Sequence, residues 1–359
     1  MTQYTHEEKQ PGENDPLEAS VKQISLSAGN EVFQEEEKAA LWERIENDFA
    51  VKQPLYRRIG WKAVAATAAV LIAATWWLLP GKTEKGESGI LQFAKQQHIS
   101  DTTTETRLML GNNRQMTLNG TNATLKYNQQ GVLLNNSQQV DQAHNGEQYN
   151  TLIVPYGRRA HITLEDGTVA WLNAGSRMIY PVVFDGLKRE VFLEGEAYFD
   201  VSQKADVPFF VYTNKLRTTV LGTGFNVSAY ADDAEQSVVL VSGNVKVKAN
   251  SSNNEQLLSP GEKAGFTISD ERLSKQTVNT LEYTSWKDGK LQFEHAPLNH
   301  IVKRLGRYFN IRITLQASEQ ATFSGDLDLA DDVETVLDAV SASTGLTYKR
   351  TEEGFIFKK

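Results

Sequence analysis

The stretch LRTTVLGTGFNVSAY (residues 216–230) decides the fold class of most of this chain. Apolar and polar residues alternate on both sides of its central Gly-Thr-Gly, which is the period of a half-buried β-strand. Glycines spaced like Gly222 and Gly224 also occur in phosphate-binding loops, but such a loop is followed by a helix. Here the next segment alternates like a strand. The stretch therefore predicts two strands joined by a tight glycine bend or bulge.

The same alternation extends in both directions, over residues 105–278. Turn dipeptides such as Asp166-Gly167 and Pro260-Gly261 punctuate it, and no amphipathic helix interrupts it. This pattern predicts an all-β domain of many short strands. Either a sandwich or a twisted, solenoid-like stack would fit it.

The pattern changes again in residues 281–359. Two segments with helical apolar spacing, at 298–310 and 333–345, alternate with strand-like segments. We expect a small α/β domain of two βαβ-like units with a short sheet.

A single apolar segment precedes the β domain. Residues 61–80, WKAVAATAAVLIAATWWLLP, carry no charge between Ala63 and Leu79 and have tryptophans near both ends. About 20 such residues span the roughly 30 Å of hydrocarbon in a bilayer, so we expect one transmembrane helix. Positive charges crowd its N-terminal flank. The expected topology therefore has residues 1–60 in the cytoplasm, followed by the span, a linker at 81–104 and the two outer domains.

The cytoplasmic tail contains one clear amphipathic helix, predicted at about residues 33–51. Its apolar stripe is too large for so short a tail to bury alone, which favours a protein partner.

Composition excludes several functional classes. The net charge of −8 argues against nucleic acid as a partner, and the absence of cysteine excludes disulfides and cysteine-based metal or thiol chemistry. The six histidines do not have metal-ligand spacing. Glu194 and Glu196 lie on one face of an expected strand, and without a facing carboxylate partner we interpret them as solvated surface. We expect no small-molecule catalysis, no cofactor and no bound metal.

The order of sequence blocks resembles the FecR-type transmembrane anti-sigma regulators, in the form common in Bacteroidetes. The resemblance rests on blocks at 151–184, 189–201, 208–230, 238–247 and 257–266. Residues 286–313 and 323–329 are similar to the domain that closes this subfamily, which is related to the short N-terminal domain of secretins and TonB-dependent receptors.

This resemblance implies a signalling role at the bacterial inner membrane. The cytoplasmic tail would bind an extracytoplasmic-function sigma factor, and the periplasmic part would receive a signal from the N-terminal signalling domain of a TonB-dependent receptor. Intramembrane and periplasmic proteases would relay that signal. The candidate sigma-binding residues are on the apolar stripe of the tail helix: Phe33, Leu41, Trp42, Ile45 and Phe49.

Some members of the family break their own chain at a Gly-Thr bond in this block, which corresponds here to Gly222-Thr223. A threonine hydroxyl can attack the preceding carbonyl if strain and a base assist it. The alternative for this pair is an intact strand with a glycine bend. The alternative for the whole protein is a membrane-tethered, periplasmic carbohydrate-binding or scaffold protein without sigma control.

Overall fold

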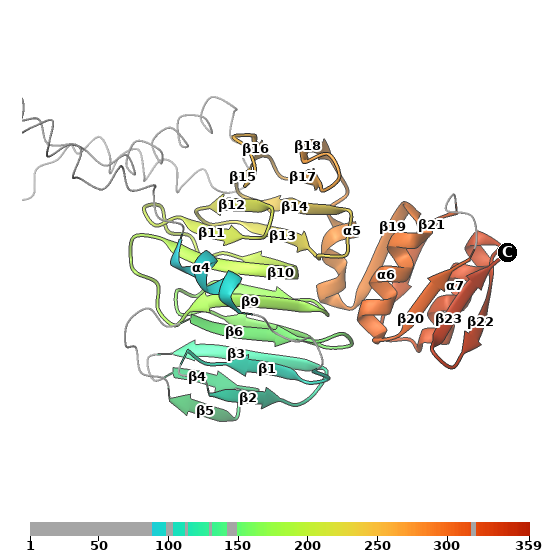
Figure 1. Cartoon of the computed structure of the whole chain (residues 1–359), viewed down its shortest axis with the longest axis horizontal. Coiled ribbons are helices and arrows are strands. Elements are labelled where there is room, and N and C mark those ends of the chain that lie inside the picture. The colour runs from blue at the N-terminus through green and yellow to red at the C-terminus, as the bar shows by residue number, and fades with distance from the viewer. Residues whose placement is uncertain (1–87, 98–102, 112–113, 129–130, 142–148, 317–320) are drawn as a thin grey trace, which may run out of the picture. The chain divides into compact units, whose positions relative to one another are not determined.

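The structure is a computed structural model of the chain, and it describes residues 88–97, 103–111, 114–128, 131–141, 149–316 and 321–359. The predicted tail helix and the predicted membrane span lie outside these ranges. Within them, no helix is long and apolar enough to cross a membrane. Element labels follow Figure 1.

Among the described residues, the all-β domain contains 18 strands in two sheets that share one strand, β10. Sheet 1 has the order β2-β1-β6-β9-β10-β11-β12-β15-β16. Its strands are β1 (Thr106–Met109), β2 (Gln115–Leu118), β6 (Tyr149–Val154), β9 (Ser176–Pro181), β10 (Arg189–Asp200), β11 (Phe209–Tyr212), β12 (Leu216–Val220), β15 (Val245–Ala249) and β16 (Glu255–Leu258).

Sheet 2 has the order β5-β4-β3-β7-β8-β10-β13-β14-β17-β18. Its other strands are β3 (Asn122–Asn128), β4 (Gly131–Leu134), β5 (Gln138–Asp141), β7 (Arg159–Thr163), β8 (Val169–Leu172), β13 (Gly224–Ala229), β14 (Glu235–Ser242), β17 (Glu262–Thr267) and β18 (Arg272–Thr277).

Successive hairpins alternate between the two sheets. The pair β11–β12 belongs to sheet 1, β13–β14 to sheet 2, β15–β16 to sheet 1 and β17–β18 to sheet 2. Each hairpin adds to the previous one in its own sheet, so the strands rise as a column in Figure 1. The prediction of a β-rich domain is confirmed. The sandwich and the stack were not exclusive, because this sandwich grows by stacking hairpins.

One core lies between the sheets, because alternate residues of every strand point inward. From sheet 1 it receives side chains such as Met178 and Leu193, and from sheet 2 such as Phe199 and Phe225. Phe199 and Phe225 stack with ring centroids 5.3 Å apart. This burial explains the period-two pattern of the sequence.

Strand β10 changes sheets at Gly195. Its first half pairs with β9 and β11, and its second half pairs with β8 and β13. Gly195 has φ +89°, and a Cβ there would lie 2.6 Å from the Cα of Ser176. Only glycine allows this conformation and this close approach together.

A buried ion pair fixes the end of the sandwich beside the Gly222 bend. Arg189 and Asp166 are almost completely buried and lie 2.8 Å apart. The Arg189 guanidinium also donates to the backbone carbonyls of Ser202, Val207 and Leu221. A buried charge with this many partners is compensated, so it ties three chain segments together.

The C-terminal residues form a small α/β domain with its own core. The predicted helices are observed as α6 (Leu298–Phe309) and α7 (Val333–Thr344). The strands form two small sheets, β19-β21 and β20-β23-β22, rather than the one short sheet expected. Each βαβ-like unit places its two strands in different sheets. The remaining elements are α5 (Leu281–Thr284), the 3₁₀ turn η1 (Ser285–Asp288), β19 (Lys290–Pro297), β20 (Arg312–Leu315), β21 (Thr322–Asp328), β22 (Thr347–Thr351) and β23 (Gly354–Lys358).

Candidate functional site

The outer face of sheet 1 carries a long groove with a volume of about 1320 Å³. Its floor is formed by outward-facing residues of β6, β9, β10, β12 and β15. At one end it is lined by Tyr230 to Asp232, after β13, and by Asn310, which ends α6. We call this feature the sheet 1 groove.

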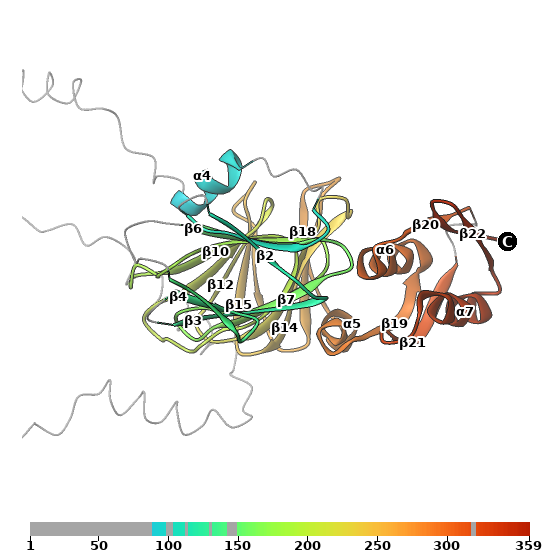
Figure 2. The same ribbon diagram turned by 90° about the horizontal axis from the view of Figure 1, so that it is seen from below.

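Helix α4 (Gly89–Gln96) closes part of the same face, within the segment expected to be a linker. It lies outside the sandwich, over β9 and β10 (Figure 2). Ile90 and Ala94 are buried against Ile179, Phe192 and Tyr212. The helix is therefore an integral part of the folded domain, anchored by apolar burial.

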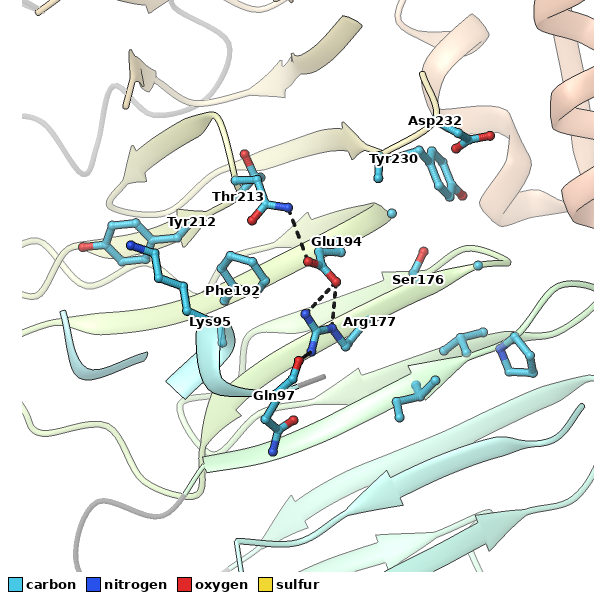
Figure 3. A pocket seen from close by; sticks show the side chains of 18 of the residues that line it. Lys95, Gln97, Ser176, Arg177, Phe192, Glu194, Tyr212, Thr213, Tyr230 and Asp232 are labelled. Atoms are coloured by element: carbon cyan, nitrogen blue, oxygen red, sulfur yellow. Dashed lines mark hydrogen bonds and ion pairs between the residues drawn. The ribbon is translucent and has the colours of Figure 1, made fainter. Parts of the chain in front are cut away.

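Charged side chains hold the C-terminal end of α4 to the groove floor (Figure 3). Arg177 forms an ion pair with Glu194 at 2.7 Å and also donates to the backbone carbonyl of Gln97, at 3.4 Å. The side chain of Asn214 donates to the same Glu194, at 3.3 Å. Arg177 thus connects α4 to the groove floor. A change at Glu194 would alter the position of Arg177 and with it the contact to the C-terminal end of α4.

The small domain packs on part of the outer face of sheet 2. The indole nitrogen of Trp286 donates to Asn226, and Asn226 donates in turn to Glu196. Glu196 accepts a further hydrogen bond from Asn173, at 2.8 Å. Trp286 is 1% exposed and lies in one apolar cluster with Trp171 of β8. This network of satisfied polar groups fixes η1 of the small domain to the sandwich.

A second contact between the domains is made by Arg307 of α6. Its guanidinium lies 2.7 Å from both Asp232 and Asp233 and stacks over the ring of Tyr230, 3.7 Å from the centroid. Burial would raise the pKa of Asp233, but the hydrogen bonds and charges of Arg307 and Lys303 outweigh it and hold that pKa below its usual value. We call Trp286, Arg307 and their partners the domain junction.

The two carboxylates singled out in the sequence do not share a face. Glu194 lies in the sheet 1 groove, whereas Glu196 is buried in the domain junction. The expectation of one strand face was wrong because β10 changes sheets at the glycine between them. The interpretation as solvated surface was also wrong for Glu196, which is 6% exposed.

The Gly222-Thr223 pair lies in a bend between β12 and β13, where the glycine bend was predicted. The backbone carbonyl of Thr223 accepts a hydrogen bond from the N–H of Val201. The Thr223 hydroxyl donates to the carbonyl of Asn244, at 3.1 Å. That carbonyl cannot take up the hydroxyl proton. Within the described residues, no hydrogen bond joins this hydroxyl to a carboxylate, imidazole or amine.

The five candidate sigma-binding residues, Phe33, Leu41, Trp42, Ile45 and Phe49, lie outside the described residues. Sequence reasoning missed the domain junction entirely. Its only local signals were a lone tryptophan at the start of the small domain, Trp286, and an arginine within an amphipathic helix, Arg307. Neither indicates its partners, which lie in a strand and in the β13–β14 turn, 60 to 75 residues away.

Comparison with known proteins gives the class of this two-domain arrangement. Residues 150–246 match the family described as FecR protein, and residues 290–357 match the family described as FecR, C-terminal. These matches fall on the sandwich and on the small domain respectively.

Solved structures of a similar protein give a further match. Two crystal structures of a proposed anti-sigma factor from Parabacteroides distasonis ATCC 8503 are 32% and 33% identical in sequence, each with a TM-score of 0.55. The matches cover 59% and 58% of this chain and 99% and 98% of theirs. None of the curated proteins matches the chain significantly. The chain belongs to the FecR-type anti-sigma factor family.

Proposed function

We propose that this protein is a single-pass inner-membrane regulator that controls a sigma factor in response to a periplasmic signal. The observation that carries the proposal is the match of both domains to the FecR family, together with the likeness to a proposed anti-sigma factor. The predicted span at 61–80 would separate these domains from the predicted tail helix.

In this proposal the tail helix binds an extracytoplasmic-function sigma factor through its apolar stripe. The test is to isolate the full-length protein from its own bacterium and to identify the proteins that remain bound. A sigma factor should be retained. The double substitution Leu41→Asp and Ile45→Asp should abolish its retention, because a charge cannot be buried in an apolar interface without a partner.

A matched control is Glu46→Gln, which changes the polar side of the same helix. Retention of the sigma factor by this variant would show that the loss is specific to the stripe. If full-length protein retains no sigma factor, or if the Leu41 and Ile45 substitutions leave retention unchanged, the proposed role of the tail is wrong. Binding of an oligosaccharide without a sigma factor would favour the tethered carbohydrate-binding alternative.

On the periplasmic side, the proposed partner is the N-terminal signalling domain of a TonB-dependent receptor. The small domain offers unpaired strand edges, since β20 and β22 are the outer strands of their sheet (Figure 1). Such edges can accept a further strand from a partner. Calorimetric titration of full-length protein with the purified receptor domain tests this step, and absence of heat and of co-elution would refute it.

The domain junction would make the two outer domains respond together. Because Trp286 and Arg307 are buried at the sandwich surface, a force on the small domain is transmitted to it. The proposed output is cleavage by periplasmic and intramembrane proteases. Full-length protein should yield shorter fragments on immunoblots only after the inducing signal, and constitutive fragments would contradict this relay.

A further inference from the structure

Two cations in the sheet 1 groove face each other without an ion pair to a described residue, although Glu255 of β16 is opposite Lys248 in the strand register. Arg217 of β12 and Lys248 of β15 are directly opposite in the strand register, and both line the groove. Neither has a carboxylate oxygen within 4.0 Å among the described residues. The adjacent acid, Glu255, is instead 3.5 Å from Lys246.

This arrangement costs folding energy. Like charges directly opposite on neighbouring strands destabilise a sheet. In addition, the Nε atom of Arg217 is buried and has no hydrogen-bond partner, and an unsatisfied buried donor is unfavourable. The fold therefore does not explain the pair, whereas a bound anion would offset both costs.

The acids of the groove are already engaged. Glu194 is paired with Arg177, and Asp232 is paired with Arg307 of the domain junction. The uncompensated charge in the groove is thus positive, at Arg217 and Lys248. A complementary ligand carries negative charge.

The shape of the groove favours a peptide. Its volume of about 1320 Å³ exceeds the roughly 300–1,000 Å³ typical of small-molecule sites. Two aromatic lining residues, Phe192 and Tyr212, are buried beneath α4, and a third, Tyr156, is exposed. The same face already packs one peptide element, since Ile90 of α4 lies against it.

We propose that the sheet 1 groove binds an acidic peptide segment of a partner protein, anchored by Arg217 and Lys248. The segment would lie between α4 at one end and Asn310, the C-cap residue of α6, at the other. It would therefore contact both α4 and the small domain. The site does not depend on the sigma-factor role of the tail.

The test uses full-length protein in detergent micelles and a fluorescein-labelled hexaglutamate peptide, with fluorescence anisotropy as the readout. The peptide should bind, and binding should weaken with salt because exposed charges are screened. The double substitution Arg217→Gln and Lys248→Gln should lower affinity about ten-fold or more. The matched control, Lys126→Gln with Lys349→Gln, removes two exposed cations outside the groove and should leave affinity unchanged.

Circular dichroism of each variant verifies that it is folded, so that a loss of binding reports on the site. Absence of hexaglutamate binding would overturn the proposal, as would equal losses in the groove and control variants. Tighter binding of hexagalacturonate than of hexaglutamate would also overturn it, because the site would then be selective for an acidic sugar.

Discussion

The two outer faces of the sandwich present opposite solutions for the same kind of surface. On sheet 2, the small domain packs on part of the face, where the polar groups of Asn226 and Glu196 are satisfied. On sheet 1, α4 covers part of the face, and Arg217 and Lys248 form no ion pair with a carboxylate of the described residues. The difference teaches that the polar groups shared by sheet 2 and the small domain have hydrogen-bond partners, whereas two cations of sheet 1 form no ion pair with a described residue, which suits that face to binding an anion.

The largest expected effect on stability is at Gly195, where β10 passes from sheet 1 to sheet 2. Gly195→Ala places a Cβ 2.6 Å from the Ser176 backbone at φ +89°. We expect a loss of about 4 kcal/mol or more in the free energy of unfolding, or failure to fold. Urea titration of residues 81–359 measures this.

Gly186→Ala is the control for that substitution, since its φ of +81° is similar and no atom lies within 4 Å of the new Cβ. It should cost only about 1 kcal/mol, from backbone strain alone. Equal effects of the two substitutions would show that close packing at Gly195 is unimportant.

The next largest effect concerns the closed face. Trp286→Ala removes a fully buried side chain and leaves Asn226 without its donor. We expect a loss of about 3–5 kcal/mol, measured by urea titration of residues 81–359. Trp286→Phe retains most of the volume and should lose about 1–2 kcal/mol. A loss below 1 kcal/mol for the alanine variant would contradict a locked junction.

The junction should also weaken in acid. The pKa of Asp233 is below its usual value in the folded protein, because the effect of Arg307 and Lys303 exceeds that of burial. The stability that the ionised Asp233 contributes is therefore fully present above the ordinary aspartate pKa of about 3.9. It is lost as the pH falls through the lower pKa that Asp233 has in the folded protein. Urea midpoints at pH 7 and pH 3 should differ more for the wild type than for Asp233→Asn. Identical differences would exclude this pair as a cause.

Substitutions on the outer face of sheet 1 should not lower stability, in contrast to those at the domain junction. The double substitution Arg217→Gln and Lys248→Gln removes two facing like charges, so we expect stability to be unchanged or to rise by about 0.5 kcal/mol. Thermal unfolding followed by circular dichroism measures the change. A loss above 1 kcal/mol would mean that these cations stabilise the fold, and the comparison between the faces would fail.

The last prediction is that the Gly222-Thr223 peptide bond stays intact. The Thr223 hydroxyl donates to the Asn244 carbonyl and to no side chain of the described residues. We therefore expect residues 81–359 to give one intact mass. Two fragments that separate Gly222 from Thr223, and that disappear in Thr223→Ala, would instead establish self-cleavage. Denaturing mass spectrometry distinguishes these outcomes.

Much of the fold could be predicted from the sequence. Alternation of apolar and polar residues indicated the β-rich domain, and helical spacing indicated α6 and α7. These patterns are local, because each residue's orientation follows from its own strand or helix. The sites could not be predicted in the same way. Arg307 meets Asp232 and Asp233 across 74 to 75 residues of sequence, and no period in the chain encodes that contact.

The sequence alone determined the β-rich character of the large domain, helices α6 and α7, the bend at Gly222 and the resemblance to the FecR family. The tertiary structure alone decided that Glu194 and Glu196 lie on different faces, that α4 packs on the sandwich, and that Arg217 and Lys248 meet without a partner. The physical reason is that secondary structure depends on near neighbours, whereas burial and charge compensation depend on which distant strands become adjacent.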